Sequence, residues 1–144
     1  MKNNRYILFL LLLFASSGTI VEAKLAQWSM SNQSLEKQFN STLSCKSAPS
    51  QGSFQNCQLN LIFQGQAVTN AKINIGGGMP AHQHGLPTAP LVKWSDTDKS
   101  YKIEGLKFSM PGEWVLHFYI DEGGTEKSKK ISYKKDIISF SLTI

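Results

Sequence analysis

The feature that most constrains this chain is a set of short runs in which apolar and polar residues alternate. The clearest runs are "CQLNLIF" (57–63), "EWVLHFYI" (113–120) and "DIISFSLTI" (136–144). A period of two is the repeat of a β-strand with one buried face, and no amphipathic helix of ordinary length competes with it. The parity predicts that one side of the 113–120 run faces the core: Trp114, Leu116, Phe118 and Ile120.

Turn signals separate these runs. They include Gly65, the Gly76–Gly78 run, Pro111-Gly112 and Gly123-Gly124. Six or seven short strands in about 100 residues are typical of two packed antiparallel sheets. We therefore predict an all-β fold, an immunoglobulin-like antiparallel β-sandwich of about seven strands. We place this domain at residues 45–144, with an N-terminal arm at 24–44 in which "SLEKQF" is compatible with a short helix.

Residues 1–23 have the layout of a secretory signal peptide. Basic Lys2 and Arg5 precede an apolar core from Ile7 to Ala15, and the segment ends in Val21-Glu22-Ala23. The apolar core is short for a bilayer of roughly 30 Å. We expect cleavage after Ala23 and a periplasmic or secreted protein. The alternative is a retained N-terminal membrane anchor that leaves the domain facing the periplasm.

The chain contains two cysteines, Cys45 and Cys57. In an oxidising compartment an isolated pair is most simply a disulfide, so we predict that these two residues are joined. A redox or thiolate–metal pair is the alternative, although the C-x-x-C spacing is missing.

The net charge is +5, and lysines concentrate in "GGTEKSKKISYKK" (123–135). We interpret this segment as a solvated hairpin, with a basic patch for acidic partners as the alternative. The sequence has no nucleic-acid motif with interleaved aromatic residues, so we expect no nucleic-acid partner.

The stretch "GGGMPAHQHGLPTAP" (76–90) is the longest part of the domain without a strand pattern, and we expect a loop there. It contains His82 and His84, and histidines two residues apart on an extended segment point to the same side. Met79 adds a thioether, a soft ligand that together with imidazole suits copper, especially Cu(I). Met110, in the turn "FSMPGEW", offers a second sulfur if that turn lies at the same end of the sandwich. Zinc is the competing metal, but a thioether is a poor zinc ligand.

Other interpretations of these residues remain open. An H-x-H pair also arises by chance, and Met79 and Met110 are equally suited to covering the open end of a small core. His117 falls on the outward parity of its strand, and we interpret it as a surface residue. No G-x-S-x-G motif and no framed pair of carboxylates accompanies the loop, so we expect that the protein is not an enzyme.

Two blocks of the sequence carry a family resemblance: "MPAHQHG" (79–85), preceded by an N-A pair, and "GLKFSMPGEW" (105–114). In this order, within Asn70–Ile120, they resemble the YtkA-like domain family of bacterial exported proteins, which are small immunoglobulin-like sandwiches related in style to FixH-type proteins. The resemblance implies a periplasmic or surface-exposed module that handles copper. The Met and His positions match the motif, whereas the segment with the cysteines is not covered.

These observations lead to two hypotheses about function. The first is an exported copper-binding protein with His82, His84, Met79 and Met110 as ligands, which buffers copper or delivers it to an envelope partner such as an oxidase assembly or a metal efflux component. The second is a protein–protein interaction module of the cell envelope, in which the proline-rich loop is a rigid contact surface and the histidines are incidental.

Overall fold

The computed structural model describes residues 27–121, 123–124 and 132–144. The predicted signal peptide (1–23) and the tip of the lysine-rich hairpin (125–131) lie outside the described residues. Within the described part, no helix has the length and apolar character needed to span a membrane.

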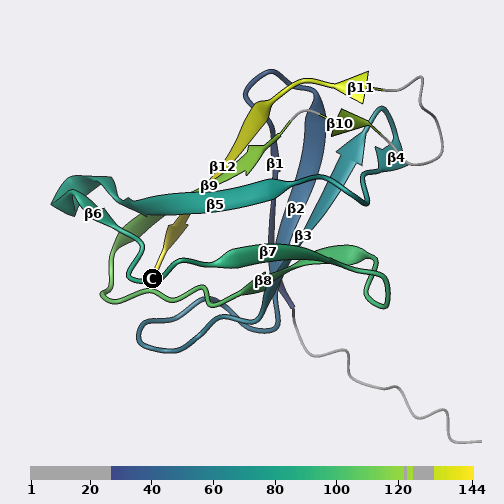
Figure 1. Cartoon of the computed structure of the whole chain (residues 1–144). Coiled ribbons are helices and arrows are strands. Elements are labelled where there is room, and N and C mark those ends of the chain that lie inside the picture. Colours follow the sequence, from purple (N-terminus) through teal and green to yellow (C-terminus); the bar gives the residue numbers. More distant parts are fainter. Residues whose placement is uncertain (1–26, 122, 125–131) are drawn as a thin grey trace, which may run out of the picture.

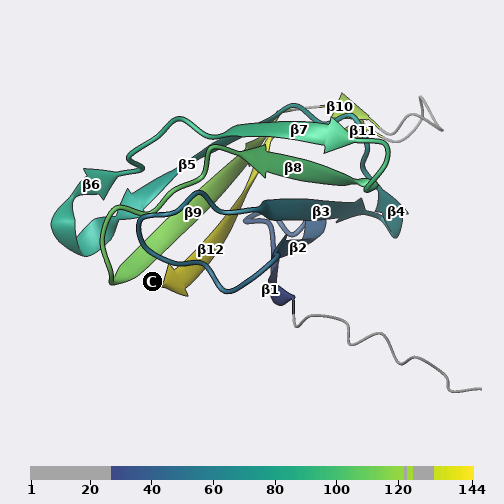
Figure 2. The same ribbon diagram turned by 90° about the horizontal axis from the view of Figure 1, so that it is seen from below.

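The fold is an all-β sandwich of two antiparallel sheets, which confirms the predicted class (Figures 1 and 2). The larger sheet has the order β1-β2-β3-β8-β7, with β4 paired to β3. Its strands are β1 (Trp28–Gln33), β2 (Phe39–Cys45), β3 (Cys57–Phe63), β4 (Gln66–Ala67), β7 (Leu91–Ser95) and β8 (Ser100–Glu104). The smaller sheet has the order β12-β9-β5-β6. Its strands are β12 (Asp136–Thr143), β9 (Glu113–Ile120), β5 (Ile73–Met79) and β6 (His84–Gly85).

A short ribbon, β10 (Gly123–Gly124) with β11 (Ser132–Tyr133), forms the base of the lysine-rich hairpin. The expected number of strands was too low, because the described residues form twelve, of which four have two residues each. A two-residue strand has no room for an alternating pattern, so periodicity cannot reveal it.

The core lies between the two sheets and contains the side chains that parity predicted. Trp114, Leu116, Phe118 and Ile120 of β9 are at most 1% exposed, and β3 buries every second residue from Cys57 to Phe63. Aromatic rings pack in pairs within the core; the Phe118 and Phe140 centroids, on the neighbouring strands β9 and β12, are 5.8 Å apart. The alternation therefore located the buried face correctly.

The expectation of an arm or short helix at 24–44 was wrong, because this segment forms β1 and β2. The apolar–polar pattern of β2 is interrupted by Ser41, a polar residue that faces the core on the same side as Phe39 and Leu43. Ser41 is 4% exposed. The Ser41 hydroxyl donates a hydrogen bond of 2.7 Å to the carbonyl of Asn32 in β1. A buried serine is tolerated here because its hydroxyl has this backbone partner.

The turn between β1 and β2 is fastened to β12 by the buried carboxylate of Asp136. This group accepts hydrogen bonds from the backbone N–H groups of Glu36 (3.1 Å) and Ile137 (2.8 Å), and from the Gln38 amide (3.2 Å). Burial raises the pKa of Asp136, but these bonds and one from the Ser34 hydroxyl outweigh it and hold the pKa below its usual value. The carboxylate is therefore bound by the fold in its charged form.

The same turn also closes the outer edge of β12. The backbone N–H of Leu35 donates to the carbonyl of Ile137 at 2.8 Å, and the Asn32 side-chain amide donates to the carbonyl of Ser139 at 2.7 Å. These two bonds join the first strand of the larger sheet to the last strand of the smaller one.

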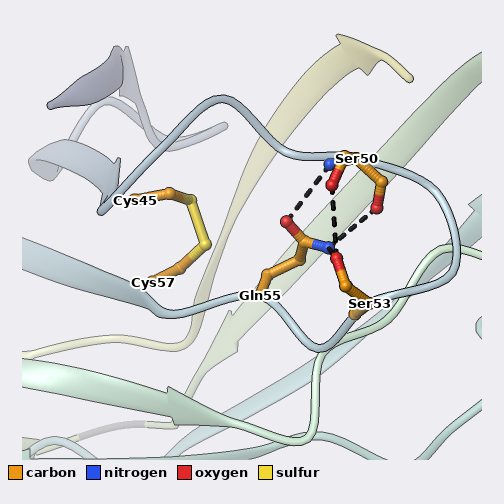
Figure 3. The surroundings of a disulfide bond; sticks show 5 residues. All are labelled: Cys45, Ser50, Ser53, Gln55 and Cys57. Atoms are coloured by element: carbon orange, nitrogen blue, oxygen red, sulfur yellow. Dashed lines mark hydrogen bonds between the residues drawn. A yellow bond between two sulfur atoms is a disulfide. The ribbon is translucent and has the colours of Figure 1, made fainter. Parts of the chain in front are cut away.

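Cys45 and Cys57 form a disulfide, as predicted, and no free cysteine occurs among the described residues. The bridge joins directly opposed residues of β2 and β3 and closes a loop with a sequence separation of 12. Inside this loop the Gln55 amide donates to the carbonyls of Ser50 (2.8 Å) and Ser53 (2.7 Å), as Figure 3 shows. In this state neither cysteine offers a thiolate to a metal ion.

Candidate metal site

The glycine run that was expected to be a loop instead continues strand β5. Gly76, Gly77 and Gly78 pair with His117, Leu116 and Val115 of β9. Gly77 has a φ of 144°, and a Cβ atom there would collide with the Val115 carbonyl oxygen. Glycine is needed at this position because the two backbones approach closely and the φ angle is one that other residues rarely adopt. The glycines hid the strand because they contribute no side chains to a pattern.

After Met79 the chain turns back on itself and carries both histidines to the end of the sandwich. The turn is the 3-10 helix η1 (Pro80–His82), which ends at Gln83 with a left-handed φ of 54°. Strand β6 then pairs with the end of β5, and this hairpin projects beyond the other strands in both views (Figures 1 and 2). The N–H of Leu86 donates to the Gly77 carbonyl at 3.1 Å and fastens the returning chain.

The imidazoles of His82 and His84 are exposed and lie side by side. Their ring centroids are 6.2 Å apart, and the ring planes are 19° from parallel. Neutral imidazole has one lone pair for a metal, so this pair offers two nitrogen ligands on one short hairpin. The two side chains lie near each other, but across a 3-10 turn with a left-handed residue and not on the extended segment that the sequence prediction assumed.

Met79 lies against the turn that contains Met110, but the two methionines have different environments. Met79 is 1% exposed and belongs to the core, whereas Met110 is half-buried. A Cβ atom added at Gly112 would be 2.8 Å from the Met79 Cε atom, so the Met110–Gly112 turn lies directly against Met79. This turn is held in place by the Trp114 indole N–H, which donates to the Met110 carbonyl at 3.1 Å. The burial of Met79 favours the packing role that the sequence left open.

His117 lies on the outward face of β9, as its parity predicted, and is half-buried there. Its Nδ1 atom is 2.8 Å from the Ser139 hydroxyl on β12. His117 and His84 line the same shallow depression of about 380 Å³, together with Gln83 and Tyr119. Sequence gave no signal for this shared surface, because it depends on the pairing of Gly76 with His117 across the two strands.

Among the described residues, no three or more His, Cys, Asp or Glu side chains form a group suited to a metal ion. A metal at this end would therefore be held by the two imidazoles together with donors of another kind. A thioether is the other donor that the sequence predicted: Met79 borders the depression shared by His84 and His117, whereas Met110 is not among its lining residues. A mixed set of imidazole and thioether is soft and suits copper better than zinc.

Comparison with known proteins gives one match. A model of the YtkA-like family matches residues 36–118, which is more than half of the chain. The match extends the resemblance noted in the sequence toward the N-terminus and includes β2, β3 and the disulfide. No curated protein and no solved structure matches the chain.

Proposed function

This chain belongs to the YtkA-like family, and we propose that it is an exported copper-binding protein that holds the ion through His82 and His84. The observation that carries the proposal is the exposed, nearly parallel pair of imidazoles with centroids 6.2 Å apart. The hairpin that bears them is fixed to β5 and β9 by backbone pairing, so little conformational freedom is lost when the pair binds an ion.

We assign the two methionines different roles within this proposal. Met110 is half-buried on the turn that packs against Met79, and we keep it as the candidate sulfur ligand. The side chain of Met79 would have to leave the core to reach an ion on the exposed imidazoles, so we assign it to packing. Its Cε atom lies against Gly112, so it packs the end of β5 against the Met110–Gly112 turn.

The exposure of both rings suits transfer of the ion. A partner's ligands can approach an exposed ion before the first set of ligands has left, whereas an enclosed site would first have to open. We therefore propose that the protein buffers copper or passes it to an envelope partner, such as an oxidase assembly or an efflux component. The disulfide is compatible with the oxidising compartment that such a role requires.

A metal titration tests the proposal directly. The mature protein is titrated with Cu(I) against a competing chelator, and with Cu(II), and is compared with His82→Ala/His84→Ala. The control is Asn74→Ala, an exposed residue of β5 outside the depression that His84 lines. We expect the double variant to lose the site and the control to keep it. Equal stoichiometry and affinity in the double variant and the wild type would refute the assignment. A wild type without any copper affinity would instead favour the interaction-module hypothesis.

A further inference from the structure

The outer face of the first three strands of the larger sheet consists almost entirely of uncharged polar side chains. The inward parity of β2 and β3 carries the core, and the opposite parity lies on the outer face, where Ser44 at one end is buried and the other side chains are exposed or half-buried. The strand register aligns the outward residues in three rows. We call these nine residues the polar grid: Ser29, Ser44 and Gln58; Ser31, Thr42 and Asn60; Gln33, Asn40 and Ile62.

The polar grid contains residue types that are unfavourable in the outer face of a stable sheet. Asparagine is depleted in strands, yet Asn40 and Asn60 each lie in the interior of one. Charged residues make up 17% of the chain, but the polar grid contains none. Residues that disagree with local preference without a packing benefit are expected at functional positions. The polar grid therefore indicates a binding function.

The polar grid also has the shape and order of a binding surface. A depression of about 400 Å³ lies over it and is lined by Ser31, Asn32, Gln33, Asn40, Ser41, Thr42, Asn60 and Ile62. From the spacing of strands and of alternate residues, the surface measures about 10 Å by 13 Å. It lies on the sheet opposite to the histidine hairpin, so it is separate from the proposed copper site.

Hydrogen bonds within the polar grid hold several of its side chains in place. The Ser31 and Thr42 hydroxyl oxygens are 2.9 Å apart, and the Gln33 amide donates to the Asn40 amide oxygen at 2.9 Å. The side chain of Asn60, in the central row, makes no hydrogen bond within the part of the chain that the structure describes. Its amide N–H groups and oxygen are therefore available to a ligand, while the fixed neighbours reduce the entropy lost on binding.

We propose that the polar grid binds an uncharged, hydroxyl-rich ligand, a short segment of a neutral polysaccharide. Amide and hydroxyl side chains both donate and accept hydrogen bonds, as the hydroxyl groups of a sugar do. The polar grid itself carries no charge, and Lys102, which lies opposite Gln58 on β8, is already paired with Asp98 at 2.8 Å, so we expect hydrogen bonding to set the specificity. Ile62 adds an apolar contact for the C–H face of a sugar ring.

Binding of neutral oligosaccharides tests this proposal. The probes are a glucose tetramer and an N-acetylglucosamine tetramer, measured by calorimetry, together with co-sedimentation with the corresponding insoluble polymers, which distinguishes free from polymeric glycan. The test variant is Asn40→Ala/Asn60→Ala. The matched control is Asn74→Ala, which removes an exposed amide from β5 on the other sheet.

We expect the wild type and the control to bind at least one probe, and the test variant to bind it about tenfold more weakly or not at all. Copper affinity is expected to be the same in all three proteins, because the two asparagines lie on the sheet opposite to the hairpin, and Tm is expected to change little, because neither asparagine belongs to the core. Failure of the wild type to bind every probe, or equal binding by the test variant, would overturn the proposal. Neither outcome affects the copper assignment, which the histidine variants test separately.

Discussion

The burial of Met79 leads to a prediction that separates its two interpretations. Met79 is 1% exposed, and its methyl group lies beneath Gly112. If its role is packing, Met79→Leu keeps most of the buried volume and removes only the sulfur. We therefore expect Met79→Leu to retain the copper affinity of the wild type and to lose less than about 1.5 kcal/mol of unfolding free energy.

Truncation at the same position supplies the magnitude of the packing contribution. Removing a buried methionine side chain costs the transfer free energy of its atoms and leaves a cavity, so Met79→Ala should lose about 3 kcal/mol. For a domain of this size that loss corresponds to a fall in Tm of roughly 12 °C. Thermal unfolding followed by circular dichroism measures it, and chelator competition measures Cu(I) affinity.

Two results would contradict the packing interpretation of Met79. A loss below about 1 kcal/mol in Met79→Ala would mean that its contacts contribute little to stability. A Cu(I) affinity about tenfold weaker in Met79→Leu, with Tm unchanged, would identify the sulfur as a ligand. The second result would restore the role that the sequence motif suggested.

Three further predictions concern the scaffold. Asp136→Asn should lower the unfolding free energy at pH 7 by about 2 kcal/mol. The pKa of Asp136 is lower in the folded protein than in the unfolded chain, so its carboxylate stabilises the fold above the unfolded-state pKa, and this stabilisation is lost as the pH falls through the folded-state pKa. Between about pH 5 and pH 2 the Tm of the variant should therefore fall less than the Tm of the wild type. Cys45→Ala/Cys57→Ala should lose about 3 kcal/mol in urea unfolding; an unchanged midpoint would mean that the loop is constrained without the disulfide. Gly78→Ala places a methyl group against the His84 carbonyl and should release β6, so exchange of the Leu86 amide hydrogen should accelerate; unaltered exchange would refute this close contact.

Alternation of apolar and polar residues was sufficient to predict the fold class and much of the core. It worked for β3, β9 and β12 because their inward positions are apolar, from Cys57 to Phe63 in β3 and from Ile138 onward in β12. It failed for β2, because Ser41 stands where the alternating pattern calls for an apolar residue. The Ser41 hydroxyl donates its hydrogen bond to a backbone carbonyl of β1, which is near only in the folded protein. Local sequence does not contain that partner.

The candidate site shows the same limit. The sequence placed His82 and His84 together because they are two residues apart, and the Met110 turn indeed lies beside Met79. It did not predict that the glycine run is a strand or that Met79 points into the core, since both depend on how closely β5 approaches β9. The polar grid was missed because its rows exist only once three strands are in register.

The hydrogen bonds that join β1 and the β1–β2 turn to β12 affect whether two molecules can pair through their sheet edges. β12 is the last strand of its sheet, and an edge strand with unpaired backbone groups is a template for another chain. Here the carbonyls of Ile137 and Ser139 already accept hydrogen bonds from Leu35 and Asn32. An incoming strand would have to break both bonds before it could extend the sheet. The segment that was expected to be a loose arm thus protects the protein against edge-to-edge aggregation.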